Sequence, residues 1–363
     1  MDFFSKENIV NLLQDNPKLV DIVKLLKSDG DDKRNLFLAA SEIKSQFVGN
    51  KVYFRGLIEY SNICRKNCYY CGIRKNNINV ARYTMTDEEV VNCAKYAYDE
   101  KYSSLVLQSG ELNNEKFRQK ISELLQKINF ATNNEMGITL SLGEQTEETL
   151  KEWQKYGGRR YLLRIETSNQ ELYIKLHPND KIHDFETRLE TLETLRKLNY
   201  QVGSGVMVGL PFQTLENLAE DILFFRDFDI DMIGMGPYIE HSDTPLYHFK
   251  NLLLPINERF ILTLKMIAVL RIMMKDVNIV ASTAMQAIDK IGREKAVKVG
   301  ANILMPNLTP QKYRENYLLY QNKPCIDEEA DQCKNCLEAR IHLVGGEIAY
   351  GQWGDSKHYL KKQ

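Results

Sequence analysis

Three cysteines crowd one short stretch of the chain, SNICRKNCYYCGIRKN, which spans residues 61–76. Cys64, Cys68 and Cys71 follow the spacing CxxxCxxC. Thiolates at this density suit metal chemistry, but a closed structural zinc site takes four ligands, and no histidine follows within a hundred residues. A [4Fe–4S] cluster fits better, because it can take three thiolates and leave one iron without a protein ligand. The stretch therefore predicts a cluster with one iron open to chemistry.

A second stretch, RRYLLRIE at residues 159–166, reads as a strand with charged side chains on one face. Side chains alternate along a strand, so Arg160, Arg164 and Glu166 share one face while apolar residues share the other. If the apolar face lies under helices, the charges point into the interior of the sheet, where unpaired charge is costly. Arg160 then belongs either to a neutralising Arg–Glu cluster or to a binding pocket. For Arg164 and Glu166 we favour the pocket.

Eight short apolar runs rich in β-branched residues, separated by amphipathic segments, must position these groups. The runs are 52–59, 104–108, 138–142, 161–166, 201–208, 232–235, 278–283 and 301–305. One intervening helix begins with a capping box, Thr86 with Glu89. Strict alternation of eight strands with helices predicts an α/β fold, a (β/α)8 TIM barrel, whose chemistry sits at the C-terminal ends of the strands. A doubly wound open sheet is the alternative.

We predict three parts of the chain: a helical extension over residues 1–50, the barrel over 51–320, and a short C-terminal segment over 321–363 that carries three more cysteines. The first cysteine stretch follows the first strand, as a barrel active site requires. Polar residues in the third strand and at the end of the seventh, such as Thr139 and Ser282-Thr283, predict a polar interior. Such an interior is typical of a cofactor pocket rather than a packed core.

The charge balance excludes several kinds of partner. Forty-eight basic against forty-nine acidic side chains predict neither a nucleic-acid surface nor an anionic-membrane surface. The longest apolar run, residues 266–274, is interrupted by Arg271 and falls short of a membrane span. The N-terminal residues lack the pattern of a signal peptide, and seven cysteines, an odd number, argue against a disulfide framework. We expect a cytoplasmic protein that acts on a small molecule.

The first trio resembles the signature of the radical S-adenosylmethionine (SAM) enzymes, with the aromatic Tyr70 directly before the last cysteine. Ser109-Gly110-Glu111 is similar to the family's GGE element, and the stretch GVMVGLP at 205–211 is similar to its glycine motif. The resemblance implies that SAM chelates the open iron and that one electron from the cluster cleaves it to a 5′-deoxyadenosyl radical. Cofactor contacts are implied for Tyr70, Ser109, Gly110, Glu111, Gly205, Met207 and Gly209.

Longer stretches, among them YLLRIETSN, VMVGLPFQT and MIGMGPYIEHSDTPL, resemble the HydE-type maturases of FeFe-hydrogenase from about residue 50 onward. This resemblance implies that Glu166 hydrogen-bonds the SAM ribose and that Arg164 and Arg188 approach the SAM carboxylate. The residues implied to line a substrate cavity are Thr139, Arg160, Ser282, Thr283 and Met305.

The same resemblance implies a role in assembly of the hydrogenase active site. The substrate would be a cysteine-ligated iron dicarbonyl cyanide synthon from a HydG-type maturase, the recipient a HydF-type GTPase scaffold, and the electron donor a ferredoxin or flavodoxin. Biotin synthase and methylornithine synthase share the barrel and the first trio, so a radical SAM enzyme for an amino-acid or vitamin precursor is one alternative. A non-catalytic iron–sulfur carrier is the other. Formation of 5′-deoxyadenosine separates enzyme from carrier.

The second trio, Cys325, Cys333 and Cys336, lies in the hydrophilic stretch CIDEEADQCKNC. The family resemblance implies an auxiliary [2Fe–2S] or [4Fe–4S] cluster near the surface, and zinc with His342 as fourth ligand is the alternative. The seventh cysteine, Cys93, lies in a helical pattern and is predicted to be a core residue. His248 and His358 are expected to be solvated.

Overall fold

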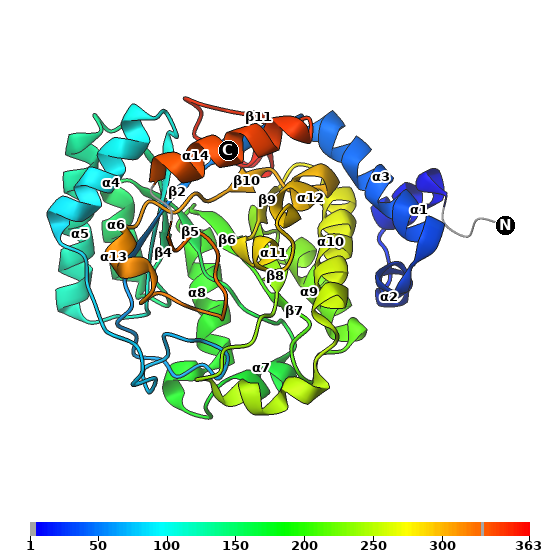
Figure 1. The fold of residues 1–363 in the computed structure, drawn as a ribbon, viewed down its shortest axis with the longest axis horizontal. Helices are drawn as coiled ribbons and strands as arrows, with labels where there is room; N and C mark the ends of the chain where they lie inside the picture. The colour runs from blue at the N-terminus through cyan, green and yellow to red at the C-terminus, as the bar shows by residue number, and fades with distance from the viewer. Residues whose placement is uncertain (1–4, 328–329) are drawn as a thin grey trace.

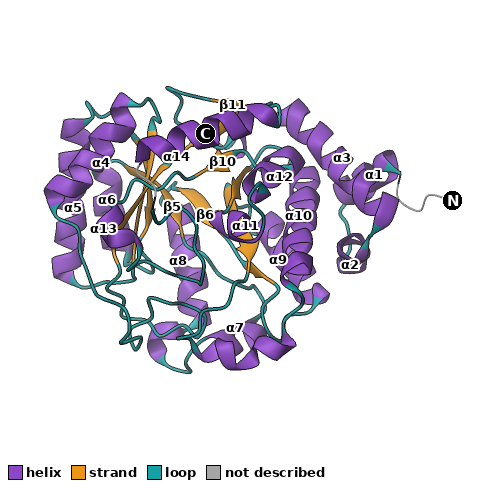
Figure 2. Ribbon diagram, viewed as in Figure 1, coloured by secondary structure: helices purple, strands orange, loops and turns teal. Residues whose placement is uncertain are grey.

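The computed structural model describes residues 5–327 and 330–363, and of residues 330–333 and 335 it describes the backbone only. Its strands form a parallel sheet that curls into a barrel, ringed by helices (Figures 1 and 2). The strands are β1 (Lys51–Phe54), β2 (Gly56–Ser61), β3 (Ser104–Ser109), β4 (Gly137–Ser141), β5 (Gly158–Leu162), β6 (Gln201–Ser204), β7 (Met207–Val208), β8 (Met232–Pro237), β9 (Asn278–Ala281), β10 (Ile303–Leu304) and β11 (Glu347–Ile348).

The sheet returns on itself because β1 and β2 are two halves of one bent strand. β1 pairs with β10, and β2 pairs with β3 at the other end of the strand order. Arg55 lies between the halves, and its N–H donates to Leu304 O, while Leu57 N–H donates to Pro306 O. The backbone ladder therefore continues around the ring. The predicted (β/α)8 architecture is confirmed, since each of the eight predicted runs contributes to a strand or a pair of collinear strands.

The fourth predicted strand, residues 161–166, begins and ends earlier than expected, as β5. Beyond Leu162 the chain keeps backbone bonds to its neighbour, from Leu163 N–H to Gly203 O and from Glu166 N–H to Gly205 O. Glu166 itself has a positive φ of 67°, a conformation that side chains other than glycine rarely adopt. The strand therefore bends out of the regular ladder at the residue that ends the predicted run.

The helices alternate with the strands and cover the outside of the ring (Figure 2). They are α1 (Lys6–Gln14), α2 (Leu19–Lys27), α3 (Gly30–Phe47), α4 (Asp87–Asp99), α5 (Glu115–Ala131), α6 (Glu147–Lys155), α7 (Gln170–Leu176), α8 (Phe185–Lys197), α9 (Leu215–Asp227), α10 (Ile256–Met273), α11 (Thr283–Ile288), α12 (Gly292–Val299), α13 (Gln311–Arg314), α14 (Ala330–Leu343) and α15 (Lys357–Leu360), with the 3-10 helices η1 (Lys181–His183) and η2 (Pro245–Leu252). The capping box of Thr86 and Glu89 starts α4 as predicted.

The helices α1, α2 and α3 precede the barrel and pack against α9 and α10. Helix α10 lies between α3 and β8, so it is buried on nearly all sides. This position explains the apolar run at 266–274. Its interrupting residue, Arg271, is buried and donates to Gly300 O and Lys275 O. No helix among the described residues is long and apolar enough to cross a membrane.

The chain after the barrel returns to the starts of the strands. Strand β11 pairs with β1, and residues 353–356 lie against the N-terminal ends of the ring. The carbonyl of Trp353 accepts from Ser104 Oγ at 2.6 Å, and that of Gly354 accepts from Asn278 Nδ2 at 2.9 Å. We call residues 353–356 the floor segment, because they close the end of the barrel opposite the cysteine stretch. In Figure 1 the C-terminus lies at the upper edge and the loop after β2 at the lower edge.

Candidate active site

The three cysteines of the first trio lie on the loop between β2 and α4, which we call the cysteine loop (residues 62–86). Cys64 Sγ accepts the backbone N–H groups of Lys66 at 3.4 Å and Glu111 at 3.3 Å. Gly110 fits against this thiol because it has no side chain: a Cβ there would lie 2.4 Å from Ile63 O and 2.8 Å from Cys64 Cβ. The structure thus brings the predicted Ser109-Gly110-Glu111 element onto the first cysteine.

Burial raises the pKa of all three thiols, and for Cys68 it does so to about 12, with the carboxylate of Glu111 as the next cause. Thiols buried beside negative charge stay protonated unless a cation takes the place of the protons. Iron would supply that charge, so the trio fits an iron–sulfur cluster chemically. Among the side chains that the structure describes, no group of three or more His, Cys, Asp or Glu is arranged to hold a single metal ion.

Arg82 holds the shape of the cysteine loop. Its guanidinium donates to the carbonyls of five loop residues, at distances from 2.6 to 3.3 Å; they are Asn62, Ile73, Arg74, Lys75 and Asn77. Arginine carries five N–H donors on a rigid plane, so one side chain can gather several carbonyls into a tight turn. This residue was not predicted, since a single arginine in a loop has no distinguishing pattern.

Two histidines support the same loop from the segment after β5. His183 Nε2 accepts Asn67 N–H at 2.8 Å, and its Nδ1 lies 2.6 Å from Asp180 Oδ1. His177 Nε2 lies 3.2 Å from the hydroxyl of Tyr70, and its ring stacks on Tyr173. Burial lowers the pKa of His177 to about 3, so its ring is neutral. Tyr70 and Met207, both predicted cofactor contacts, pack against one apolar cluster beside this segment.

A buried ion network lies next to the trio. Lys66 Nζ is 2.5 Å from Glu144 Oε1 and 3.4 Å from Glu111 Oε2. Arg188 bridges the same two carboxylates, at 2.7 Å to Glu111 and 3.0 Å to Glu144. Burial opposes the charge of Glu111, but Arg188 and Lys66 outweigh it and lower its pKa. Arg65 also lies 3.7 Å from Glu144, so three cations surround two carboxylates in a site where single charges would be costly.

The network joins the predicted arginine and glutamate of the fourth strand. Arg188 Nη1 donates to Arg164 O at 2.8 Å. The guanidinium of Arg164 donates two hydrogen bonds of 2.8 Å to the two carboxylate oxygens of Glu166. Glycine is required beside this pair: a Cβ on Gly205 would lie 1.9 Å from Gly234 O and 3.0 Å from Arg164 Nη1. Glu166, whose φ is positive, is thus fixed by Arg164 as well as by its backbone. The structure brings together Glu111, Arg164, Glu166, Arg188 and Gly205.

Gly209, the second glycine of the motif, contacts Arg259 and not the pair of Arg164 and Glu166. Gly209 has a φ of 82°, and a Cβ there would lie 2.4 Å from Arg259 Cγ. Its N–H donates to Gln213 Oε1 at 2.7 Å. Ser109 Oγ donates to the carbonyl of Gly110. These residues shape the backbone of the C-terminal rim.

The predicted substrate residues divide between the two ends of the barrel. Arg160 and Thr139 belong to the floor: Arg160 Nε donates to Thr139 Oγ1 at 3.0 Å, and the guanidinium also reaches Ser104 Oγ, Trp353 O and Asp355 Oδ1. The neutralising partner of Arg160 is therefore Asp355, and Glu166 pairs with Arg164 alone.

The other three predicted substrate residues are not on the floor. Ser282 and Thr283 start α11 after β9, and the hydroxyl of Ser282 is buried with no hydrogen-bond partner. Met305 packs on an interior apolar cluster of Leu162, Met232, Val280 and Ile303. An unpartnered buried hydroxyl beside an apolar wall leaves a polar group for a bound molecule to satisfy.

Two cysteines of the second trio, Cys325 and Cys336, have thiols near arginine side chains. Cys325 Sγ is 4.0 Å from Arg293 Nη2, and Cys336 Sγ, on α14, is 3.9 Å from Arg340 Nη1. The side chain of Cys333 lies outside the described residues. His342 is exposed and follows Cys336 by six positions, which places the two side chains about 120° apart around the helix. Cys93 is buried as predicted, and its thiol donates to Leu308 O.

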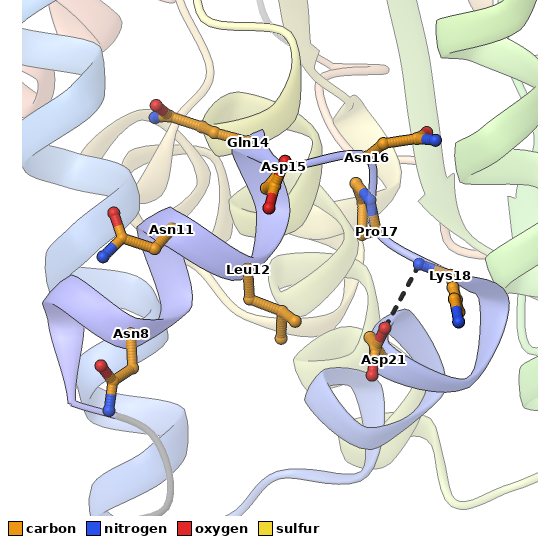
Figure 3. A pocket seen from close by; sticks show the side chains of 9 residues that line it. All are labelled: Asn8, Asn11, Leu12, Gln14, Asp15, Asn16, Pro17, Lys18 and Asp21. Atoms are coloured by element: carbon orange, nitrogen blue, oxygen red, sulfur yellow. Dashed lines mark hydrogen bonds between the residues drawn. The ribbon is translucent and has the colours of Figure 1, made fainter.

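A groove of about 730 Å³ in the N-terminal extension does not belong to this site. It lies between α1 and α2 and is lined by the residues drawn in Figure 3, among them Asn8, Asn11 and Lys18. None of its lining residues is a predicted site residue.

Comparison with known proteins agrees with the fold and the motifs. Residues 58–225 match the model of the radical SAM superfamily. The [FeFe] hydrogenase maturase subunit HydE of Thermotoga maritima is 44% identical over 328 residues, which cover 90% of each chain. The crystal structure of methylornithine synthase has a TM-score of 0.77 at 23% identity and covers 94% of this chain and 98% of its own. The structure of the maturase HydG from Carboxydothermus hydrogenoformans also has a TM-score of 0.77, at 20% identity, and covers 95% and 79%.

A parallel (β/α)8 barrel with a CxxxCxxC loop after its first strand defines a radical SAM enzyme, a class whose cofactors are a [4Fe–4S] cluster and SAM. Within that superfamily, the chain belongs to the HydE family.

Two charged residues of the site, Lys66 and Glu144, were not predicted. Glu144 follows the third strand in the stretch LGEQ, and Lys66 lies between the first two cysteines. A carboxylate after a barrel strand is a usable signal, because such positions meet at the C-terminal rim. Lys66 could not be found this way, since a lysine in a loop is usually solvated.

Proposed function

We propose that this chain is a maturase of the [FeFe]-hydrogenase active site that acts on a cysteine-ligated iron dicarbonyl cyanide synthon. The observation that carries the proposal is the hydrogen bond from the Glu111 N–H to Cys64, next to the ion pair of Glu111 with Arg188, in a chain 44% identical to a HydE maturase subunit. A HydG-type maturase would supply the synthon, and a HydF-type GTPase scaffold would receive the product.

Cys64, Cys68 and Cys71 would hold the [4Fe–4S] cluster. When bound, the cluster and SAM supply a 5′-deoxyadenosyl radical at the cost of one electron. The N–H groups of Lys66 and Glu111 stabilise negative charge on the sulfur of Cys64 by donating to it. Arg82 and His183 hold the backbone of the loop that carries the three thiols.

The ion network would orient SAM. Arg188 uses three of its five N–H donors on Glu111, Glu144 and Arg164 O, which leaves two for the SAM carboxylate. We assign Arg164 to the same carboxylate and Glu166 to the ribose. Ser109, Gly110, Gly205, Met207 and Gly209 shape the backbone around the ligand, and Tyr70 covers one side of it. Neutral His177 offers no charge to disturb the network.

The barrel interior would hold the substrate between its apolar cluster and its polar ends. Ser282 and Thr283 offer hydroxyl groups near the rim, Met305 contributes to the apolar wall, and Thr139 and Arg160 offer donors at the floor. A closed ring protects a carbon radical from water and from competing hydrogen donors. Carbonyl and cyanide ligands are weak acceptors on an otherwise apolar group, which suits such a wall with few donors.

The test is anaerobic reconstitution with iron and sulfide followed by reduction with dithionite in the presence of SAM. Formation of 5′-deoxyadenosine is expected, together with a four-iron electron paramagnetic resonance signal that changes on SAM addition. After incubation with the synthon and removal of the unbound molecule, carbonyl and cyanide infrared bands that stay with the protein would support the proposed identity of the substrate. Cleavage of SAM stimulated by a lysine or a biotin precursor, and not by the synthon, would contradict it. Absence of 5′-deoxyadenosine would favour an iron–sulfur carrier.

We also propose an auxiliary [2Fe–2S] or [4Fe–4S] cluster at Cys325, Cys333 and Cys336. Arg293 and Arg340 lie close to two of these thiols and place positive charge where an anionic cluster would be held. The position of His342, away from Cys336 on α14, does not favour a zinc site of three cysteines and this histidine. Iron content of the protein after removal of all three cysteines, compared with the intact chain, tests the assignment.

A further inference from the structure

The segment around the cysteine loop carries positive charge only. From Tyr60 to Thr86 it contains five basic residues, Arg65, Lys66, Arg74, Lys75 and Arg82, and no aspartate or glutamate. The whole chain is nearly neutral, with 48 basic and 49 acidic side chains, so this run is a local departure from the average. A concentration of one charge at one place attracts partners of the opposite charge.

Three of the five basic residues already have partners. Lys66 pairs with Glu111 and Glu144, Arg65 lies 3.7 Å from Glu144, and Arg82 donates to loop carbonyls. In the described part of the chain, by contrast, no carboxylate forms an ion pair with Arg74 or Lys75. Lys75 is exposed, and Arg74 has a buried Nε with no hydrogen-bond partner. The ammonium of Lys75 is therefore available to a molecule outside the chain, and the half-buried guanidinium of Arg74 adds positive charge next to it in the sequence.

An exposed apolar residue follows these charges. Ile78 has 92% of its surface exposed, and Ile63, in the same loop, has 41%. A large exposed apolar side chain next to uncommitted cations has the composition of a small protein-docking patch, with an apolar centre and a charged rim. We call Arg74, Lys75 and Ile78 the loop patch. In Figure 1 the loop runs through the lower part of the molecule beside α7.

The loop patch lies within a few residues of a thiol. The N–H of Arg74 donates to Cys71 O at 3.2 Å, in a turn that also binds Asn77 to Arg74 O. A protein seated on the patch would thus contact the outer side of the turn that holds the third cysteine.

We propose that the loop patch is the docking surface for an acidic one-electron donor protein, of the flavin or iron–sulfur type. The inference rests on the proposed function, which requires one electron for each SAM cleaved. In the step at this surface one electron passes from the reduced donor to the cluster; the donor is oxidised, the cluster is reduced, and no covalent bond forms or breaks. Arg74 and Lys75 steer the donor, and Ile78 excludes water from the contact.

The experiment compares the double variant Arg74→Glu/Lys75→Glu with the matched double variant Lys116→Glu/Lys298→Glu. Both introduce the same change in charge, and Lys116 and Lys298 are exposed residues on α5 and α12. The probe is a purified flavodoxin with an acidic face around its flavin. Its dissociation constant is measured by calorimetry at low and at high salt, and 5′-deoxyadenosine formation is measured with reduced flavodoxin and with dithionite.

We expect the patch variant to bind flavodoxin at least about tenfold more weakly at low salt, with a smaller salt dependence, while the control variant binds as the unaltered chain does. Formation of 5′-deoxyadenosine should fall with flavodoxin and stay unchanged with dithionite. A third variant, Ile78→Ser, should weaken binding without altering the loop charges.

Equal flavodoxin binding by the patch and control variants would overturn the inference. So would a loss confined to binding of a HydF-type scaffold, which would assign the patch to that partner instead. Failure of the unaltered chain to cleave SAM with dithionite is a different result, because it contradicts the proposed function and leaves the binding measurement to decide the docking surface.

Discussion

Arg160 and Arg188 are both buried arginines inside one barrel, yet they are satisfied in different ways. Arg160, at the floor, donates mainly to uncharged oxygens and pairs with the single carboxylate of Asp355. Burial lowers its pKa, and Asp355 offsets part of that effect. Arg188, at the rim, shares two carboxylates with Lys66, and Glu111 and Glu144 raise its pKa despite burial.

The difference separates a structural end from a chemical end. The floor is closed by hydrogen bonds from several strands to one short segment, and Arg160 already makes four hydrogen bonds there within the chain. The rim instead gathers thiols, paired charges and a strained glutamate, which is the arrangement expected where cofactors bind. Substitutions at the rim should therefore change chemistry first, and substitutions at the floor should change stability first.

The largest effect is expected at the thiols. Replacing Cys68 by serine removes one ligand of the proposed cluster, and SAM cleavage should be lost completely because the remaining two thiolates cannot hold the cluster in place. Iron content and 5′-deoxyadenosine formation measure the change. Cys93→Ser is the control, since this buried thiol lies outside the loop. A four-iron signal that survives loss of Cys64, Cys68 and Cys71 together would contradict the assignment of the rim.

Glu144→Gln is expected to have the next largest effect. It removes one negative charge from the network and leaves Lys66 and Arg188 to share Glu111. Because Glu111 and Arg188 lie beside the SAM site, cleavage should slow by about 10–100-fold, as for other groups that support metal-site ligands. Single-turnover formation of 5′-deoxyadenosine is the measurement. If this variant reacts as fast as Glu152→Gln, which removes a half-exposed partner of Arg118, the network has no role in chemistry.

Asp355→Asn tests the floor, where we expect a loss of stability and no loss of SAM cleavage. The variant leaves Arg160 buried without a charged partner, so the free energy of unfolding should fall by about 2 kcal/mol. Urea unfolding of the protein without cofactors measures this loss. The folded fraction should still cleave SAM at the unaltered rate in the absence of substrate. Slow SAM cleavage with an unaltered free energy of unfolding would show that the floor of the barrel takes part in the chemistry, against the proposed division between floor and rim.

A smaller, pH-dependent effect is expected at the far edge of the floor. His358 lies between Asp276 at 3.1 Å and Asp229 at 2.6 Å, and its bonds to Asp276 and then to Asp229 raise its pKa against the effect of burial. A raised pKa stabilises the fold fully below the unfolded value of about 6.5, and the contribution is lost as pH rises through the folded value. His358→Gln should therefore cost about 1 kcal/mol near pH 6 and little near pH 9. Equal costs at the two values would exclude this role.

The sequence alone was sufficient for the barrel and for most of the rim. Eight alternating runs predicted the ring, and local motifs predicted Cys64, Glu111 and Gly205, whose contacts depend on short stretches at the ends of strands. The prediction for His358 was wrong: it was expected to be solvated, but only 24% of its side chain is exposed and two aspartates bind it. His248 is exposed as expected.

The floor could not have been predicted in the same way. Asp355 lies 195 residues from Arg160, and no periodicity or motif links the two positions. Lys66 and Glu144 present a similar difficulty, since their pairing depends on how two loops meet at the rim. Patterns in a sequence report neighbours along one element, whereas these contacts join elements that only the closed ring brings together. The assignments of substrate residues and of the three parts of the chain stay predictions.

The floor segment follows every barrel strand in chain order, and this has a consequence for biosynthesis. When β10 leaves the ribosome, 49 residues still separate Leu304 from Trp353. At about 5–20 residues per second, the ring exists for roughly 2–10 seconds with its lower mouth open. During translation the nascent barrel thus passes through a stage in which water and small solutes can reach its interior from below, until residues 353–356 are in place.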